Sequence, residues 1–175
     1  MKRKLWLTTE RLNIYHPDKS DYKNFCKLLT HADVMEYTFN IKNKEEVKNE
    51  LQGLIKHYKS FGFAAGSVHL KNSGEFIGRA GLFYPKSKSE NPPCLICLLL
   101  PNFWRQGYGT ETLKEIIKFG FETLEHSKIF GLVHENNFSS QKLVKKFTPI
   151  IQSKTDHNGK KFHNYIFSKE NFMKS

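Results

Sequence analysis

The sequence predicts one α+β (mixed α/β) domain, with about four helices around a central twisted mixed sheet of about six to seven strands. Two amphipathic patterns of helical period lie in the first third of the chain, and apolar extended segments joined by a tight turn follow them. Extended and helical patterns then alternate, which is typical of layers packed around one sheet. A length of 175 residues fits a single domain over residues 1–175, because no stretch resembles a linker or a repeat.

The first part of the chain contains one short strand and two helices. Leu12–Tyr15 is predicted as a strand, and His16-Pro17 stops it. A helix follows, capped by Asp18 or Ser20, because apolar residues then recur at helical spacing. Lys44–Lys59 is predicted as the second helix, since one of its faces is apolar and the other carries Lys and Glu.

The middle of the chain is predicted to be extended. Phe61–Leu70 and Phe76–Phe83 are rich in β-forming residues, and the turn-forming segment Lys71–Glu75 separates them. A polar loop at Lys86–Pro93 leads to Cys94–Leu100, which is apolar throughout. Continuous apolar character predicts a strand that is buried on both faces.

Helical and extended patterns alternate over the last part of the chain. A helix with an apolar stripe is followed by a strand, a short helix and a final hairpin around the turn signal Asn158-Gly159. The predicted elements are a helix at Gly109–Leu124, a strand at Lys128–Val133, a helix at Ser139–Phe147, and hairpin strands at Ile150–Ile151 and Phe162–Phe167.

The chain is strongly basic. It carries 28 Lys and Arg against 17 Asp and Glu, which gives a formal net charge of +11. Such a charge attracts polyanions and phosphorylated cofactors in general, but the positive residues are scattered along the sequence. Since no helix-turn-helix, zinc-finger spacing or basic-aromatic sheet motif accompanies them, we expect no specific recognition of nucleic acid.

Three features predict a cytoplasmic protein with no membrane contact. The segment Met1–Thr9 is basic but lacks the apolar core of a signal peptide. The longest apolar run, Cys94–Leu100, is far shorter than the roughly 20 residues that cross a bilayer. Three cysteines cannot pair completely, which favours a reducing compartment.

Cys94 and Cys97 have the spacing of a metal or redox pair. Residues three apart in an extended strand point to opposite faces, so both thiols cannot reach one ion. No second cysteine pair and no histidine pair at metal-ligand spacing is present. We therefore expect no metal, and we expect these cysteines to behave as small apolar residues.

The segment from Leu98 to Thr112 contains the strongest chemical signal. An apolar strand stops there, and a loop with Gly107 and Gly109 leads into the first turn of a helix. Free amides and the positive end of the helix dipole attract phosphate at such a turn, and Arg105 adds a charge. The sequence excludes a nucleotide P-loop, because no Gly-Lys-Ser/Thr follows, and the third glycine of a dinucleotide fingerprint is replaced by Thr112. A diphosphate site and a plain strand-to-helix turn both remain consistent with these residues.

Neighbouring motifs favour the diphosphate site. Arg-Gln-Gly-Tyr-Gly-Thr followed by Glu, at residues 105–111, resembles the (Gln/Arg)-x-x-Gly-x-(Gly/Ala) acetyl-CoA loop of the GNAT acetyltransferases, and Asn137-Phe138-Ser139-Ser140 resembles their Asn-x-x-Ser element. Thr9–Leu12, Asp33–Tyr37 and Phe76–Leu82 fit the same family. The resemblance covers nearly the whole chain, and it is strongest to the subgroup of ribosomal-protein N-terminal (RimJ/RimL-like) acetyltransferases.

This resemblance implies a GNAT-type fold with acetyl-CoA as co-substrate. The backbone of the apolar strand would pair with the pantetheine amides, and the glycine loop would hold the diphosphate. Ser140 would donate a proton to the departing thiolate, and Lys142, Lys145 or Lys146 would meet the other phosphate. The implied cofactor-binding residues are Leu98, Leu99, Leu100, Arg105, Gln106, Gly107, Tyr108, Gly109, Thr110, Asn137 and Ser140.

The sequence departs from the family where many relatives carry an acidic residue early in this strand, because Cys94–Cys97 contains no carboxylate. The remaining candidates for a general base are Asp156, His134 and Glu135. Without a strong base, deprotonating a lysine amine at pH 7 costs roughly 4–5 kcal/mol, whereas an α-amine costs only about 1 kcal/mol. We therefore expect an α-amine acceptor, with water relaying the proton.

The sequence as a whole predicts an acetyl-CoA-dependent N-acetyltransferase that acts on a primary amine. The candidate acceptor is the N-terminal α-amine of a protein or peptide, a ribosomal protein among them, and the enzyme is expected to be a monomer or a homodimer. Two alternatives remain: a non-catalytic acyl-CoA-binding domain, and a basic RNA- or ribosome-associated binding module on the same fold. Trp104 either anchors the loop or lines the acceptor cleft, and we prefer the role of anchor.

Overall fold

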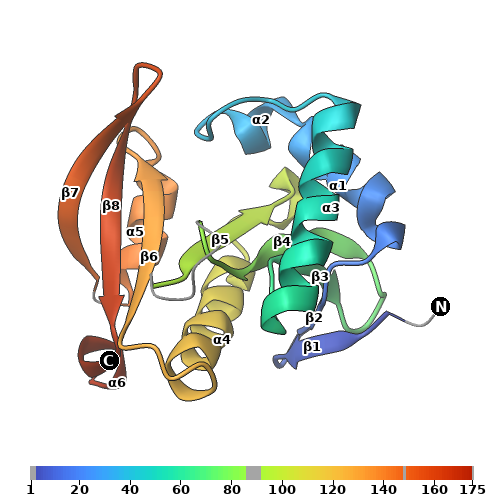
Figure 1. The fold of residues 1–175 in the computed structure, drawn as a ribbon. Helices are drawn as coiled ribbons and strands as arrows, with labels where there is room; N and C mark the ends of the chain where they lie inside the picture. Colours follow the sequence, from blue (N-terminus) through green and yellow to red (C-terminus); the bar gives the residue numbers. More distant parts are fainter. Residues whose placement is uncertain (1–2, 86–91, 148, 175) are drawn as a thin grey trace.

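Eight strands form one mixed sheet in the computed structural model, which describes residues 3–85, 92–147 and 149–174. The strand order is β1-β2-β3-β4-β5-β6-β8-β7, and only the β5–β6 pair is parallel (Figure 1). The strands are β1 (Leu5–Thr8), β2 (Leu12–Tyr15), β3 (Gly66–Leu70), β4 (Phe76–Phe83), β5 (Cys94–Leu99), β6 (Lys128–His134), β7 (Ile150–His157) and β8 (Lys160–Ser168). The helices are α1 (Tyr22–Leu29), α2 (Ala32–Met35), α3 (Lys44–Phe61), α4 (Tyr108–Glu122), α5 (Phe138–Lys145) and α6 (Lys169–Met173), with 3₁₀ turns at Lys19–Asp21 and Pro101–Phe103.

The predicted fold class is confirmed, but the sheet has eight strands rather than six to seven. The strand that was missed is β1, which has four residues and pairs with β2. None of its four side chains is fully buried, so no buried apolar face marks the segment. β7 extends to His157 instead of ending at Ile151, and all of its side chains are exposed, so no alternation of apolar and polar residues marks it.

Helix α3 includes Phe61, the first residue of the predicted strand at Phe61–Leu70. Gly62 caps its end, with a left-handed φ of 79° and an N–H that donates to the Tyr58 carbonyl at 2.8 Å. Glycine adopts this conformation without the cost that a side chain would add. β3 therefore begins only at Gly66. Most of the polar loop predicted at Lys86–Pro93 lies outside the described residues.

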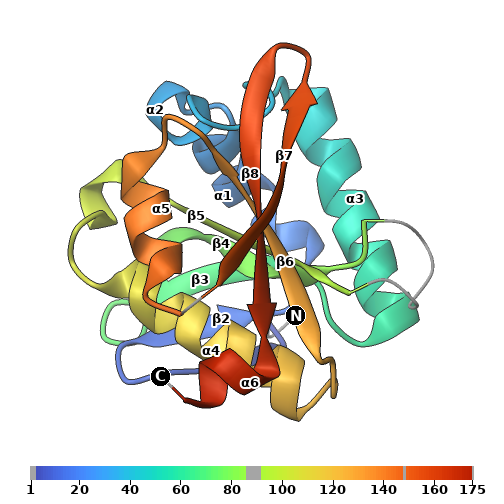
Figure 2. The same cartoon turned by 90° about the vertical axis from the view of Figure 1, so that its left-hand side faces the viewer.

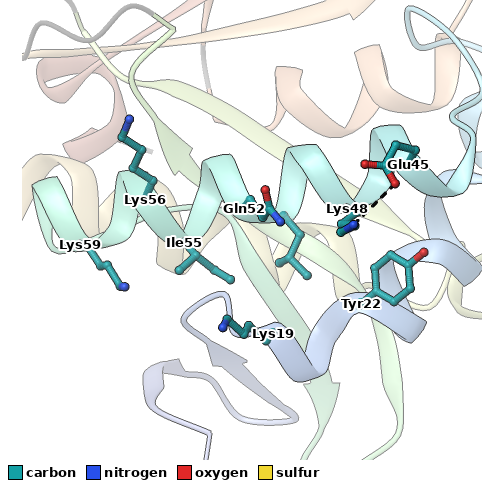
Figure 3. Close-up of a pocket in the computed structure, with 9 residues that line it drawn as sticks. Lys19, Tyr22, Glu45, Lys48, Gln52, Ile55, Lys56 and Lys59 are labelled. Carbon is teal, nitrogen blue, oxygen red and sulfur yellow. Dashed lines mark ion pairs between the residues drawn. The ribbon is translucent and has the colours of Figure 1, made fainter.

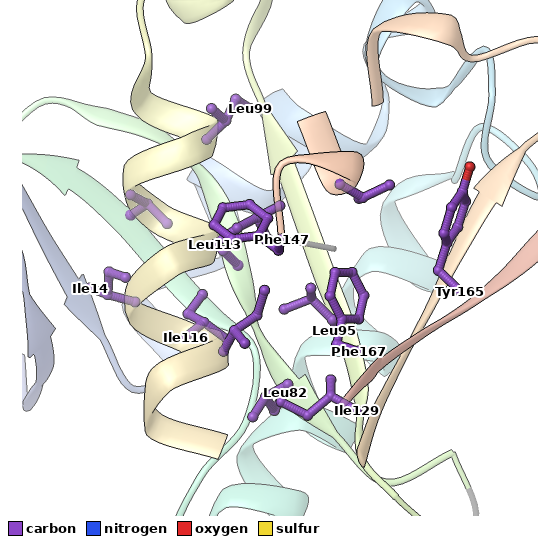
Figure 4. Packing of buried hydrophobic residues seen from close by; sticks show 14 of the residues in the cluster. Ile14, Leu82, Leu95, Leu99, Leu113, Ile116, Ile129, Phe147, Tyr165 and Phe167 are labelled. Atoms are coloured by element: carbon purple, nitrogen blue, oxygen red, sulfur yellow. The ribbon is translucent and has the colours of Figure 1, made fainter. Parts of the chain in front are cut away.

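Two apolar clusters fill the space on the two faces of the sheet. Helix α4 packs Leu113, Ile116 and Phe121 against β4, β5 and β6, as the periodicity of its sequence predicts (Figure 4). Phe25 of α1 and Leu51 of α3 belong to the second cluster. Figure 2 shows α3 on one side of the sheet, and α4 with α5 on the other. Among the described residues, no helix is both long and apolar enough to cross a bilayer.

Strands β5 and β6 separate soon after they meet. Their pairing includes only Cys94 with Phe130 and Leu95 with Gly131. Beyond these pairs β5 follows β4, whereas β6 follows β8 (Figure 1). Because β6 no longer pairs with β5 beyond Leu95, the middle of β5 is only partly buried. The prediction that this strand is buried on both faces is wrong there.

His16 is buried between two aromatic rings. Its ring stacks on Trp6 at 5.6 Å and on Tyr58 at 4.1 Å between centroids. Burial, with the nearby charge of Lys4, lowers the pKa of His16 to about 4. Its buried Nδ1 has no hydrogen-bond partner among the described residues. The ring is therefore held as a neutral stacking group.

Acid is expected to destabilise the fold through this histidine. Unfolded His16 binds a proton near pH 6.5 and folded His16 only near pH 4, so stability is complete above pH 6.5 and is lost as the pH falls toward 4. The full shift corresponds to about 3 kcal/mol. Urea unfolding of wild type and His16→Phe at pH 7 and pH 4 measures this, because phenylalanine keeps the stack without titrating. Equal losses of stability in the two proteins would contradict the prediction.

Candidate active site

A cleft of about 380 Å³ lies where β5 and β6 separate. Its walls come from the segment after α1, from α3, from strands β4, β5, β6 and β8, and from α5. The predicted site residues Leu98, His134, Asn137 and Ser140 all line it. Side chains from both halves of the sheet therefore meet in one cavity.

The edge of β5 presents only alternate backbone groups to this cleft. The Leu100 N–H donates to the Ile77 carbonyl at 2.8 Å, and the antiparallel register runs on without a shift. Backbone polar groups alternate in direction along a strand. Those of Leu98 and Leu100 therefore face β4, whereas those of Leu99 and Cys97 face the gap.

Trp104 already forms a hydrogen bond with one of these backbone groups. Its indole Nε1 donates to the Leu99 carbonyl at 2.7 Å, so the side chain ties the loop after β5 back to the strand. This contact agrees with the expected role of Trp104 as a loop anchor. The groups of the edge that face the gap are then the Leu99 N–H and both backbone groups of Cys97.

The loop after Trp104 has the backbone shape of an anion site. Arg105 and Gly107 both have left-handed φ values, of 58° and 84°. Left-handed residues that alternate with other conformations turn successive amides toward one point and form a concave site for an anion. Arg105 adopts this conformation with a side chain, which costs about 1–2 kcal/mol. The rest of the structure must hold the loop in this shape.

The first turn of α4 continues the same surface. Gly107 is the N-cap residue, and no side chain caps the helix there. The Gly107 carbonyl accepts from the Glu111 N–H at 3.0 Å, so the amides of Tyr108, Gly109 and Thr110 precede the first helical hydrogen bond. These donors and the helix dipole favour a bound phosphate.

One of the three lysines predicted near a phosphate reaches this turn. Lys146 Nζ donates to Thr110 Oγ1 at 3.3 Å, although it belongs to the end of α5. Lys142 and Lys145 are exposed on the same helix. The structure therefore brings Lys146 to the first turn of α4.

The beginning of α5 places Asn137 and Ser140 side by side. Asn137 is the N-cap residue, and its Oδ1 accepts from the Ser140 N–H at 3.0 Å. The Ser140 hydroxyl makes no hydrogen bond within the described part of the chain. This hydroxyl is therefore available to a bound molecule in the cleft.

His134 lines the cleft beside them. Its Nδ1 accepts from the Asn136 N–H at 3.1 Å, and its ring contacts Tyr37 and Phe162 at 5.5 and 5.2 Å between centroids. An accepting Nδ1 assigns the proton of the neutral ring to Nε2. The ring then presents a hydrogen-bond donor rather than a base.

The other predicted bases do not line the cleft. Asp156 Oδ1 accepts from the Gly159 N–H at 2.9 Å and so stabilises the turn between β7 and β8. Glu135 is not among the lining residues either, and its carbonyl accepts from Gln141 Nε2 at 2.7 Å. The structure brings His134, Asn137 and Ser140 together and leaves Asp156 outside.

Two carboxylates that sequence reasoning did not single out, Glu46 and Glu50, line the cleft. Glu50 contacts Arg79 at 2.6 Å and Lys42 at 3.1 Å. Burial alone would raise the pKa of Glu50, but the charges of Arg79 and Lys42 hold it below its usual value. Glu46 Oε2 accepts from the Asn43 N–H at 2.7 Å and caps α3. Their i, i+4 spacing on one helix was the available signal.

Burial keeps the thiols of Cys94 and Cys97 in β5 protonated. Burial raises the pKa of Cys94 to about 11 and that of Cys97 to about 12. Both thiols are therefore neutral near pH 7. The described residues contain no group of three or more His, Cys, Asp or Glu side chains arranged to hold a metal.

A second, larger groove of about 730 Å³ lies on the opposite side of α3 (Figure 3). Lysine and aliphatic side chains dominate it, with one ion pair between Lys48 and Glu45 at 3.7 Å. It has neither a backbone edge nor a glycine loop. The lining residues are Lys19, Tyr22, Glu45, Lys48, Leu51, Gln52, Ile55, Lys56 and Lys59. The cleft between β5 and β6 is therefore the candidate active site.

Comparison with known proteins gives a consistent result. Residues 11–147 match the family model described as an acetyltransferase (GNAT) domain. The uncharacterized N-acetyltransferase YoaA of Bacillus subtilis is 20% identical, covering 93% of this chain and 94% of that protein. Among solved structures, spermidine N-acetyltransferase from Vibrio cholerae, with CoA and spermine, has a TM-score of 0.77 at 13% identity, covering 93% and 98% of the two chains. RimL, a ribosomal L7/L12 alpha-N-protein acetyltransferase, has a TM-score of 0.79 at 12% identity, covering 96% of each chain.

Proposed function

The chain belongs to the GNAT acetyltransferase family, whose members use acetyl-CoA, and on that premise we propose that its acceptor is an N-terminal α-amine. The observation that carries this proposal is that the candidate bases lining the cleft, among the described residues, already have partners. Glu50 is held in two ion pairs, Glu46 caps a helix, and His134 presents a donor. An amine that enters such a cleft must lose its proton without a strong base, and an α-amine does so at the lower cost. A protein or peptide N-terminus, that of a ribosomal protein included, is the substrate class.

The residues of the cleft and the loop fit acetyl-CoA. Amides of Tyr108, Gly109 and Thr110 supply donors for the diphosphate, and Arg105 lies in the same loop. The edge of β5 offers the N–H of Leu99 and the N–H and carbonyl of Cys97 to an extended arm with amide groups of its own. We assign the pairing with pantetheine to these two residues, within the predicted run Leu98–Leu100 and one position before it.

Catalysis then depends on the positioning of the two substrates and on two hydrogen donors, a backbone N–H of β5 and the Ser140 hydroxyl. Acetyl-CoA supplies an activated acyl group as its thioester. A backbone N–H on the edge of β5 polarises the thioester carbonyl while the neutral amine attacks it. Ser140 donates its proton to the sulfur as the C–S bond breaks, and the proton that the acylated amine releases passes through water to the Ser140 oxygen.

The acceptor class is tested with two matched peptides. One carries a free N-terminus and no lysine, and the other carries a blocked N-terminus and one lysine. At pH 7.5 the neutral fraction of an α-amine exceeds that of a lysine by about two hundredfold, and we expect kcat/KM to differ by a similar factor. For the first peptide, kcat/KM should rise with pH to about 8 and then level off, following the pKa of the amine itself.

Release of free CoA monitors the reaction for both peptides. A preference for the lysine peptide would overturn the α-amine assignment. If CoA binds but neither peptide nor any of a panel of small amines is acetylated, the non-catalytic alternative is favoured instead. Tight, salt-sensitive binding of RNA without affinity for CoA would favour the RNA-binding module.

A further inference from the structure

Arg11 joins the turn between β1 and β2 to the first turn of α4, 100 positions along the chain. Its backbone N–H donates to Glu111 Oε1 at 2.8 Å, and its Nε donates to Glu111 Oε2 at 2.7 Å. The Thr9 hydroxyl donates to the same carboxylate. Glu111 is therefore held by three donors from outside its own helix.

The same guanidinium also contacts the glycine loop. Its Nη1 donates to the Gln106 carbonyl at 3.1 Å, and its Cζ lies 4.3 Å from the centroid of the Tyr108 ring. Its Nη2 lies 3.2 Å from the position that a Cβ on Gly107 would occupy. One side chain thus touches the loop on both sides of the left-handed Gly107.

Arg11 also neutralises the negative charge of Glu111 beside the loop. Burial would raise the pKa of Glu111, but the hydrogen bonds from Thr9 and Arg11 hold it below its usual value, so Glu111 stays ionised. The hydrogen bond with Glu111 raises the pKa of Arg11 in turn. A bare carboxylate in the first turn of α4 would repel a diphosphate bound at that turn. The ion pair with Arg11 removes this repulsion.

We propose that Arg11 is a positioning residue, which holds the diphosphate loop in its binding conformation. This inference rests on the proposed function, because it requires that the loop bind a diphosphate. The loop contains Arg105 in a strained left-handed conformation, and it needs support from elsewhere in the fold to keep that shape. Arg11 supplies that support from a different part of the sheet.

The experiment compares two acyl donors, acetyl-CoA and S-acetylpantetheine, of which the second lacks the diphosphate. With Arg11→Gln we expect the KM for acetyl-CoA to rise by about tenfold to a hundredfold, with kcat within about twofold, since a lost charge-assisted hydrogen bond has this effect on affinity. Kinetics with S-acetylpantetheine should not change. Lys118→Gln, which breaks another ion pair on α4, is the matched control and should behave as wild type.

Two further variants separate geometry from charge. Arg11→Lys keeps the charge but cannot bond Glu111 and Gln106 as a fork does, so it should lose most of the affinity that Arg11→Gln loses. Full affinity in Arg11→Lys, or in the double variant Arg11→Gln/Glu111→Gln, would show that charge alone matters and would overturn the positioning role.

The remaining outcomes distinguish this inference from the proposed function. Equal loss with both donors would mean general damage to the fold, and the inference would fail. If wild type acetylates no amine, the proposed function fails. Calorimetry with CoA then still tests Arg11: weaker binding by Arg11→Gln supports its role, and unchanged binding overturns it.

Discussion

Replacing Gly107 by valine is expected to weaken CoA binding by at least about tenfold. A β-branched residue at a φ of 84° costs more than the roughly 1–2 kcal/mol of an ordinary side chain, and each 1.4 kcal/mol is a factor of ten. The new Cβ would also meet Arg11 Nη2 at 3.2 Å. Both effects push the loop away from the shape that gathers its amides. Calorimetry with CoA measures the change.

Gly62 provides a matched control for this substitution. It has a nearly identical φ of 79°, lies at the end of α3, and has nothing within 4 Å of its added Cβ. Gly62→Val should therefore lose similar stability while it keeps its affinity for CoA. If both variants lose affinity equally, or if a pantetheine without phosphate binds wild type as tightly as CoA does, the loop is not a diphosphate site.

Replacing Ser140 by alanine is expected to lower kcat by about a hundredfold to ten-thousandfold, the range typical of a lost general acid. The KM for acetyl-CoA should change little, because Asn137 accepts from the backbone N–H of residue 140, which alanine retains. The cap of α5 therefore survives the substitution. Steady-state kinetics with a saturating peptide acceptor measure the effect.

The neighbouring Ser139 is the control for this change. It is exposed, lies one position earlier on the same helix and does not line the cleft. Ser139→Ala should keep the wild-type kcat. An unchanged kcat in Ser140→Ala would remove this hydroxyl from the proton transfer and leave that role to water.

Local patterns were sufficient to predict the elements whose chemistry is periodic. The apolar stripe of α4 was visible in the sequence because Leu113, Ile116 and Phe121 repeat at helical spacing, and the structure buries all three. Gly107, which precedes that helix, was equally visible, since its φ above zero favours glycine. These features depend on neighbours along the chain, which a sequence displays directly.

Contacts between distant positions were not predictable in the same way. Nothing in the sequence pairs Arg11 with Glu111, because their contact depends on how β1 and β2 lie against α4. The same holds for Cys97, whose backbone faces the gap only because β6 departs from β5 after Leu95. One residue of shift in this register would have exchanged the roles of neighbouring residues.

The indole of Trp104 has a consequence for how this protein behaves at high concentration. A strand edge with free amides and carbonyls is a template on which a strand from another molecule can assemble into aggregates. The indole blocks the carbonyl of Leu99, so an invading strand would find one of its expected acceptors already taken. A short ligand that needs only a few of these groups can still bind, whereas pairing with a long strand of another molecule is disfavoured. The same side chain thus disfavours pairing with a strand of another molecule and leaves the gap open to a small ligand.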